Sequence, residues 1–259
     1  MGKIKGSFQV NQNNFLIEAK HNTPLTLIET RIIKSLVSTI QPSMEDISCI
    51  RLNLKDFMEL IGMKNTNQTH IKRICANLSE KRIDVQRMDS EDWIVTRWVA
   101  EVRYLSREKI LEFDIPRSTQ GYFKDFSKGY VHYELKYALM AKSVYTVRIY
   151  ELSKKWFKLK SFEYELDELR KKIGAIGKSY DIYGNFKAKA LKPAIDEINE
   201  ITDIKIDYKE IKDGKKVVAI KFSVKPRNTS IKRKKYSPDT VLPPLNKEKE
   251  ADEIIKNMF

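Results

Sequence analysis

The same short pattern of residues occurs in each half of this sequence. In the first half, residues 54–62 form an amphipathic segment that ends on glycine, and a polar turn and a helical segment that reaches residue 85 follow. In the second half, residues 166–174 and the stretch up to residue 206 repeat this arrangement. A short helix, a turn, a second helix and an alternating strand are the order of a winged helix-turn-helix. The sequence therefore predicts an α+β protein with two tandem winged helix-turn-helix domains and small antiparallel sheets.

The length and composition of the chain allow two folded domains with further segments around them. Of its 259 residues 41% are hydrophobic, which is enough for two domains of roughly 100 residues each. A weakened pattern between residues 117 and 142 places the domain boundary near Gly129. We expect a flexible N-terminal arm at 1–22, a first domain at 23–128, a second domain at 129–227, and a basic linker and C-terminal tail at 228–259.

The formal net charge of +14 indicates a polyanionic partner. Such a charge attracts phosphate, although charge alone does not choose among DNA, RNA and an anionic membrane. No stretch approaches the roughly 18 apolar residues that a membrane span needs, and no secretory signal is recognisable, so we expect a cytoplasmic protein. Cys49 and Cys75 form no CxxC motif, which argues against a zinc site or a disulfide framework.

The second helix of the first pattern has an apolar face and a polar face. Its apolar positions follow helical spacing and should face inward: Ile71, Ile74, Cys75 and Leu78. Its opposite face carries hydroxyls, basic groups and a small residue: Thr66, Thr69, Lys72, Arg73 and Ala76. An Arg suits guanine edges and a Lys suits phosphate, so this face fits a DNA major groove. A solvated helix face is the alternative interpretation.

The second pattern contains a comparable helix, from about residue 184 to residue 199. Its expected inner face is Leu191, Ala194, Ile195 and Ile198, and its expected outer face is Asn185, Lys189 and Lys192, with Lys187 less clearly placed. The turn before it is polar and basic, with Lys178, Ser179 and Tyr180. Pro193 lacks a backbone N–H and should disturb the helix.

Two alternating runs joined by Asp213-Gly214 predict a hairpin that forms the wing. Its tip carries Lys212, Lys215 and Lys216, which suit phosphate contacts or else protect the sheet edges as solvated lysines. In the first half, Trp93 and Trp98 lie on predicted strands, and we interpret both as sheet packing. Beyond the hairpin, a run of basic residues precedes apolar positions at helical spacing, Ala251, Ile254, Ile255 and Met258, which predict a small amphipathic helix, a fold-back or disorder.

The sequence contains no complete enzyme motif that we recognise. The segment from Gly174 to Ser179 resembles a phosphate-binding loop, but that loop needs GxxxxGK[ST] and Lys172 stands where its first glycine should be. The three histidines, at 21, 70 and 132, are isolated, and no nucleophile–base arrangement can be drawn. We expect neither catalysis nor a cofactor or metal.

Two stretches carry a resemblance to a known family. Residues 142–152 and 185–199 look like the theta-type, iteron-binding plasmid replication initiator (Rep) family, and residues 25–29 and 78–85 are similar to its first domain. The resemblance implies binding of double-stranded DNA at direct repeats, opening of a nearby AT-rich segment, and host partners such as a helicase, a primase or the chromosomal initiator. It also implies a homodimer or a monomer–dimer equilibrium.

The resemblance assigns base reading to the second domain, at Asn185, Lys187, Lys189 and Lys192, and a weaker share to Thr66, Thr69, Lys72 and Arg73. Two other functions remain open. A winged-helix transcriptional repressor would look the same in sequence. A nicking-joining rolling-circle enzyme would require a covalent tyrosine–DNA intermediate, and the isolated histidines offer no metal site for it.

Overall fold

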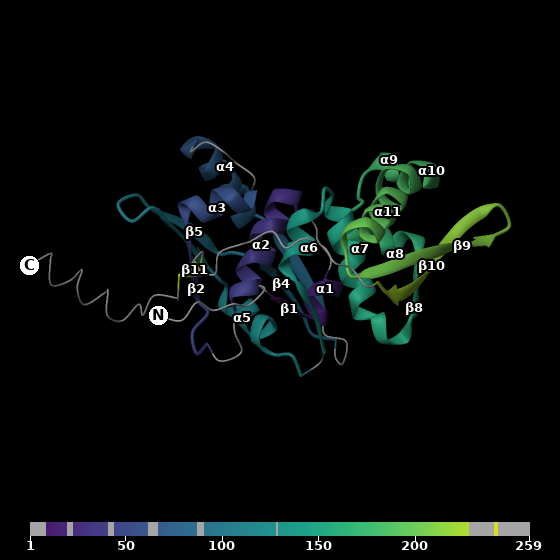
Figure 1. Cartoon of the computed structure of the whole chain (residues 1–259), viewed down its shortest axis with the longest axis horizontal. Helices are drawn as coiled ribbons and strands as arrows, with labels where there is room; N and C mark the ends of the chain where they lie inside the picture. Colours follow the sequence, from purple (N-terminus) through teal and green to yellow (C-terminus); the bar gives the residue numbers. More distant parts are fainter. Residues whose placement is uncertain are drawn as a thin grey trace, which may run out of the picture.

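The computed structural model describes residues 9–19, 23–40, 44–61, 67–86, 91–127, 129–227 and 241–242. Two α/β units lie beside each other along the long axis of the molecule, the first at the left of Figure 1 and the second at the right. The amphipathic segment expected near the C-terminus and the residue Thr66 lie outside the described residues.

The first unit has the element order of a winged helix. Its elements are α2 (Leu27–Thr39), β2 (Cys49–Asn53), α3 (Leu54–Ile61), α4 (Gln68–Ser79), β5 (Glu101–Leu105) and β6 (Ile110–Asp114). A capping box begins α2, because the Thr26 hydroxyl accepts from the Glu29 N–H and the Glu29 carboxylate accepts from the Thr26 N–H. The antiparallel strands have the order β2-β6-β5, so the β5–β6 hairpin is the wing of this unit.

The second unit repeats this order. Its elements are α7 (Val144–Lys155), β8 (Ser161–Glu165), α8 (Leu166–Ile173), a broken helix over residues 183–201 that we call the recognition helix, β9 (Ile204–Asp213) and β10 (Lys216–Pro226). Its strand order, β8-β10-β9, matches the order β2-β6-β5 of the first unit. The prediction of two tandem winged helices with small antiparallel sheets is therefore confirmed.

The second helix of the first unit is shorter than the sequence predicts, whereas that of the second unit ends close to the predicted residue 199. The helix α4 ends at Ser79, and residues 82–86 form a strand, β3 (Arg82–Gln86), that pairs with β4 (Trp93–Arg97) as a hairpin inserted before the wing. In the second unit the helix ends at Ile201 and β9 begins at Ile204. Period-two burial explains the strand, because Ile83 and Val85 are buried while the residues between and before them are not.

The prediction of a flexible arm through residue 22 is wrong for residues 9–19. They form β1 (Gln9–Asn13) and α1 (Asn14–Glu18), and β1 pairs antiparallel with β7 (Tyr130–Glu134). Val10, Leu16 and Ile17 are fully buried. Two amide side chains of this segment are bonded inside the fold: Gln12 accepts from Lys34, and the Asn13 side chain caps α1. We call residues 9–19 the N-terminal brace.

No gap in packing separates the two units at Gly129. The helix α7 contacts α1 and β7 on one side and α8 and the recognition helix on the other. The connecting elements α5 (Arg117–Lys124), α6 (Leu135–Met140) and the short η1 (Phe157–Leu159) complete the fold, and one continuous cluster of buried hydrophobic residues runs through both units. Within the predicted tail, β11 (Val241–Leu242) pairs with β2, so the chain returns to the first sheet.

A buried group of charges lies where α7 meets the first unit. The Glu151 side chain has no exposed surface, and its carboxylate lies 2.6 Å from Lys34 Nζ and 3.3 Å from Arg148 Nη1 and accepts from the Tyr133 hydroxyl at 2.6 Å. Burial acts to raise the pKa of Glu151, but Lys34 and Arg148 outweigh it and hold that pKa below its ordinary range. The carboxylate is therefore the common counterion of two buried cations.

Replacing Glu151 with Ala should lower the free energy of unfolding by about 3–5 kcal/mol, since it leaves two cations buried without their counterion. Urea denaturation measures the change. The exposed Glu200 on the recognition helix, replaced with Ala, is the control and should stay close to the wild type. Equal stability of the two variants would contradict the role assigned to Glu151.

Candidate nucleic-acid interface

The recognition helix of the second unit follows the short helix α8. Gly174 ends α8 in the left-handed conformation, with φ of 77°, and its N–H bonds to a carbonyl of the last turn. After the turn come α9 (Lys178–Asp181), α10 (Tyr183–Phe186), a π-helical turn η2 (Lys187–Leu191) and α11 (Lys192–Ile201). The chain is thus helical from Tyr183 to Ile201.

The π-helical turn is the disturbance that Pro193 predicts. In a regular α-helix the proline ring would meet the carbonyl of Lys189, and the proline offers no N–H to that carbonyl. The N–H of Lys192 bonds instead to the carbonyl of Lys187, five residues earlier, which widens the helix immediately before the proline. The helix continues on both sides of this turn.

The predicted faces of this helix are confirmed except at Asn185. Leu191, Ala194, Ile195 and Ile198 are buried, whereas Lys189 and Lys192 are exposed. Asn185 is half-buried, so it offers less of its side chain than we expected. Lys192 Nζ lies 2.7 Å from a carboxylate oxygen of Asp196 one turn later. Two lysines therefore project from the solvent side of the helix.

Lys187 forms an ion pair with the wing. Its Nζ lies 2.7 Å from Glu210 Oε1 on β9, and the same oxygen accepts from the Tyr183 hydroxyl at 2.7 Å. The hydrogen bonds from Lys187 and Tyr183 hold the pKa of Glu210 below its ordinary range, and the bond to Glu210 raises the pKa of Lys187. Glu210 thereby connects the recognition helix to the wing. The sequence offered no sign of this contact, because the partners are far apart along the chain.

The wing is the hairpin that Asp213-Gly214 predicts. Gly214 has φ of 57°, and the strands pair from Asp213 and Lys216 down to Ile204 and Pro226. Lys212, Lys215 and Lys216 are exposed at its tip, and Lys178 and Ser179 are exposed in the turn that begins α9. Tyr180 is half-buried, and its hydroxyl lies 2.9 Å from that of Tyr145 on α7. Tyr180 thus also supports the fold.

In the first unit, α4 presents the face that the sequence predicts. Ile71, Ile74, Cys75 and Leu78 are buried, and Thr69, Lys72, Arg73 and Ala76 are exposed. Arg73 Nη2 lies 2.9 Å from His70 Nδ1. Burial raises the pKa of the Cys75 thiol to about 12, so this cysteine is protonated at neutral pH and acts as a core residue.

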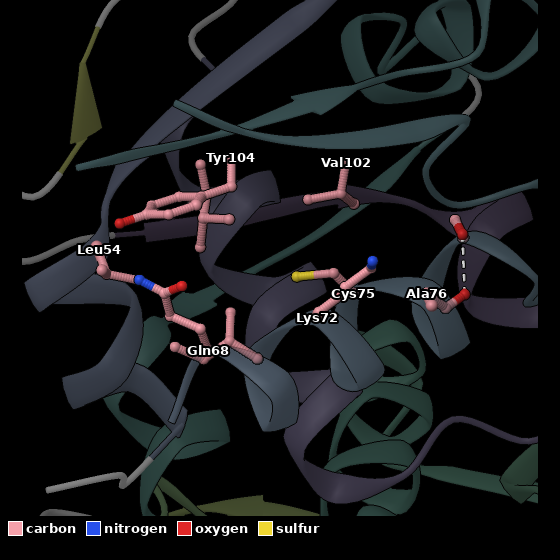
Figure 2. Close-up of a pocket in the computed structure, with 10 residues that line it drawn as sticks. Leu54, Gln68, Lys72, Cys75, Ala76, Val102 and Tyr104 are labelled. Atoms are coloured by element: carbon pink, nitrogen blue, oxygen red, sulfur yellow. Dashed lines mark hydrogen bonds between the residues drawn. The ribbon is translucent and has the colours of Figure 1, made fainter. Parts of the chain in front are cut away.

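An apolar groove lies between part of α4 and its own wing. Figure 2 shows the groove, with Gln68, Lys72 and Cys75 of α4 on one side and Val102 and Tyr104 of β5 on the other. Its volume is about 350 Å³. The second unit bridges the corresponding position with the Glu210 contacts. The two units therefore share a topology but hold their recognition helices differently.

Of the two tryptophans that we interpreted as sheet packing, only Trp98 is buried, and it lies in a bend after β4 and not on a strand. Trp98 is 1% exposed and lies against Phe123. The prediction for Trp93 is wrong, because 73% of its surface is exposed on the outer face of the inserted β3–β4 hairpin. That hairpin packs only its inner face, against α1 and α5, and the sequence alternation does not show which face is covered.

Two features of other protein classes are absent from the described residues. Within this part of the chain, no helix is long and apolar enough to cross a membrane. The same residues contain no group of three or more His, Cys, Asp or Glu side chains placed to hold a metal ion.

Comparison with known proteins places this geometry in a family. A model described as initiator replication protein, WH1, matches residues 9–154, and one described as initiator Rep protein, WH2, matches residues 165–224. The chain belongs to the initiator replication protein family. The first match begins at the N-terminal brace and runs past Gly129 into α7, in agreement with the continuous packing there.

A solved structure agrees with the fold. The crystal structure of the Pi initiator protein in complex with iteron DNA matches with a TM-score of 0.67 and 19% identity, over 85% of this chain and 98% of its own. The WH1 domain of MSBI1.176, a replication protein isolated from a multiple sclerosis patient, matches with a TM-score of 0.26 and 16% identity, over 38% of this chain and 75% of its own, a score too low to bear on the fold. No protein with a curated description matches.

Replacing Lys189 and Lys192 together with Ala should lower the affinity for this protein's specific site by about 10- to 100-fold, because contacts at or near base edges carry the discrimination. Affinity for random duplex should fall much less. The control pair is Lys205→Ala with Lys225→Ala, which removes the same charge from exposed positions at the base of the wing. Fluorescence anisotropy on both duplexes measures the ratio, and an equal loss on both duplexes would contradict the assignment.

Proposed function

We propose that this protein is a plasmid replication initiator that binds direct repeats, or iterons, at an origin, promotes local opening and recruits host replication proteins. The observation that carries the proposal is the duplicated winged helix, with an exposed basic helix face in each unit and a lysine-tipped wing in the second. The family match and the fold shared with an initiator described in complex with iteron DNA support it.

In the proposed complex the residues divide by role. Asn185, Lys187, Lys189 and Lys192 lie on the helix that enters the major groove, while Lys178, Ser179, Tyr180, Lys212, Lys215 and Lys216 contact or approach phosphate. In the first unit, Thr69, Lys72 and Arg73 lie on a second helix face that contacts the DNA. Thr66, which precedes this helix in the sequence, is assigned the same role. Contacts to phosphate position the protein and contacts to base edges specify the site.

The proposed mechanism uses binding energy and no covalent step. Binding to several repeats bends the DNA, and the cost of deformation is lowest at flexible pyrimidine–purine steps such as TA, which favours opening in an AT-rich segment that contains them beside the repeats. A host helicase, primase or chromosomal initiator then acts on the opened segment. The protein works in the cytoplasm, as a homodimer or in a monomer–dimer equilibrium in which the two forms act differently.

The test is DNase footprinting of the DNA around this protein's gene, with permanganate probing of unpaired thymines on the same supercoiled template. We expect a ladder of protected direct repeats beside a reactive AT-rich segment. Protection without reactive thymines, even with host extract added, would favour a transcriptional repressor. A tyrosine–DNA adduct formed with a divalent metal would instead identify a nicking-joining enzyme.

Salt dependence provides an independent test of the charged surface. If the protein neutralises on the order of 6–10 phosphates, the logarithm of its affinity should fall linearly with the logarithm of salt concentration, with a slope near −0.9 per phosphate. Replacing Lys215 and Lys216 with Ala should make the slope shallower by about two, on specific and random duplex alike. An unchanged slope would remove the wing tip from the interface.

A further inference from the structure

We propose that Glu18, in the N-terminal brace, is a positioning residue that sets the two winged helices in the relative placement needed to engage one DNA site together. This inference rests on the proposed function for its DNA readout, but the underlying contact exists in the DNA-free protein.

The brace contacts both units. On the side of the first unit, β1 pairs with β7 and packs against α2, and α1 packs against β3. Towards the second unit, Arg148 of α7 donates to the backbone carbonyl of Ile17 at 2.7 Å and to that of Lys172 at 3.0 Å. One guanidinium therefore joins the brace to the C-terminal end of α8, the first helix of the second helix-turn-helix.

Glu18 adds a charged link at the same place. Its carboxylate is paired with Lys155 of α7 and with Lys172 of α8, and it accepts from the Tyr164 hydroxyl of β8 at 2.8 Å. Tyr164 is itself held by the indole N–H of Trp156 at 2.9 Å. A single side chain of the brace thus contacts the first helix, the first strand and the second helix of the second unit.

The environment makes this link strong. Only 16% of the Glu18 side chain is exposed, and Lys155 and Lys172 are covered to a similar degree. Burial acts to raise the pKa of Glu18, but the bonds from Lys155 and Lys172 outweigh it and hold that pKa below its ordinary range. The carboxylate is therefore ionised at neutral pH, and its loss would leave two covered lysines without their shared partner.

The link bears on DNA recognition because α8 carries the recognition helix behind it. If both units bind one site, the second binding event is intramolecular, and its gain depends on a geometry that permits simultaneous contact. Loosening the brace should reduce that gain while each unit keeps its own contacts. The expected signature is a loss confined to DNA that both units occupy.

The experiment compares Glu18→Gln with two matched variants. Tyr164→Phe removes the neutral hydrogen bond to Glu18 and the acceptor of the Trp156 indole N–H but leaves both lysine pairs of Glu18 in place, and it should have a smaller effect. Glu163→Gln makes the same chemical change as Glu18→Gln at an exposed position on β8 and should behave as the wild type.

The DNA readout is affinity for a whole protected repeat and for its two halves as separate duplexes. Glu18→Gln should weaken binding to the whole repeat about tenfold and leave each half within about twofold of the wild type. A similar loss on the halves would show that Glu18 merely supports the folding of one unit, and would overturn the proposal.

The second readout needs no DNA. Small-angle X-ray scattering should give a larger radius of gyration for Glu18→Gln than for Glu163→Gln, and hydrogen exchange should speed up in α1 but not in the β9–β10 hairpin. Unchanged scattering and exchange would overturn the proposal. If the wild type does not prefer a repeat to random DNA, the proposed function fails, and the scattering comparison still decides the role of Glu18.

Discussion

The fold depends on the burial of charge around α7, the helix that packs against elements of both units. A helix that is packed on two sides exposes little of its surface to water, so charged side chains on it lose their hydration. Even so, Arg148 and Glu151 of α7 are buried. They are tolerated because each has partners: Glu151 meets Lys34 and Tyr133, and Arg148 donates to carbonyls of two other helices. Such groups contribute little net stability compared with apolar packing, but they are costly to separate. These buried charge contacts therefore favour one arrangement of the two units over arrangements in which one unit has slid or rotated relative to the other.

Features that depend on neighbouring residues could be predicted from the sequence. The buried faces of both recognition helices follow from helical spacing at Ile71 to Leu78 and at Leu191 to Ile198, and the Asp213-Gly214 turn places the wing. The capping box at Thr26 and the disturbance at Pro193 are likewise local. The duplicated order of elements, which determines the topology, is the sum of these local patterns.

Features that depend on distant residues could not be predicted. The brace is rich in amides, and its burial requires a strand, β7, more than 100 residues away in sequence, with Gln9 opposite Glu134. The link from Lys187 to Glu210 joins a helix to a strand that no motif connects. The sequence around Trp93 has the usual alternation of a strand with one buried face. Only the packing of the hairpin shows that Trp93 lies on the face exposed to solvent. In each case long-range packing decides the environment of the residue.

The two units also differ in mechanical character. Because Glu210 holds the recognition helix to the wing, the second unit would meet a duplex as one stiff body, and any misfit between groove and protein would have to be taken up by the DNA. In the first unit an apolar groove lies beside the contacts between α4 and β5, so the helix and its wing are joined by apolar packing over a smaller part of their surfaces. In an assembly on several repeats, the strain of bending would accordingly fall on the DNA beside the second unit, and the first unit would adapt.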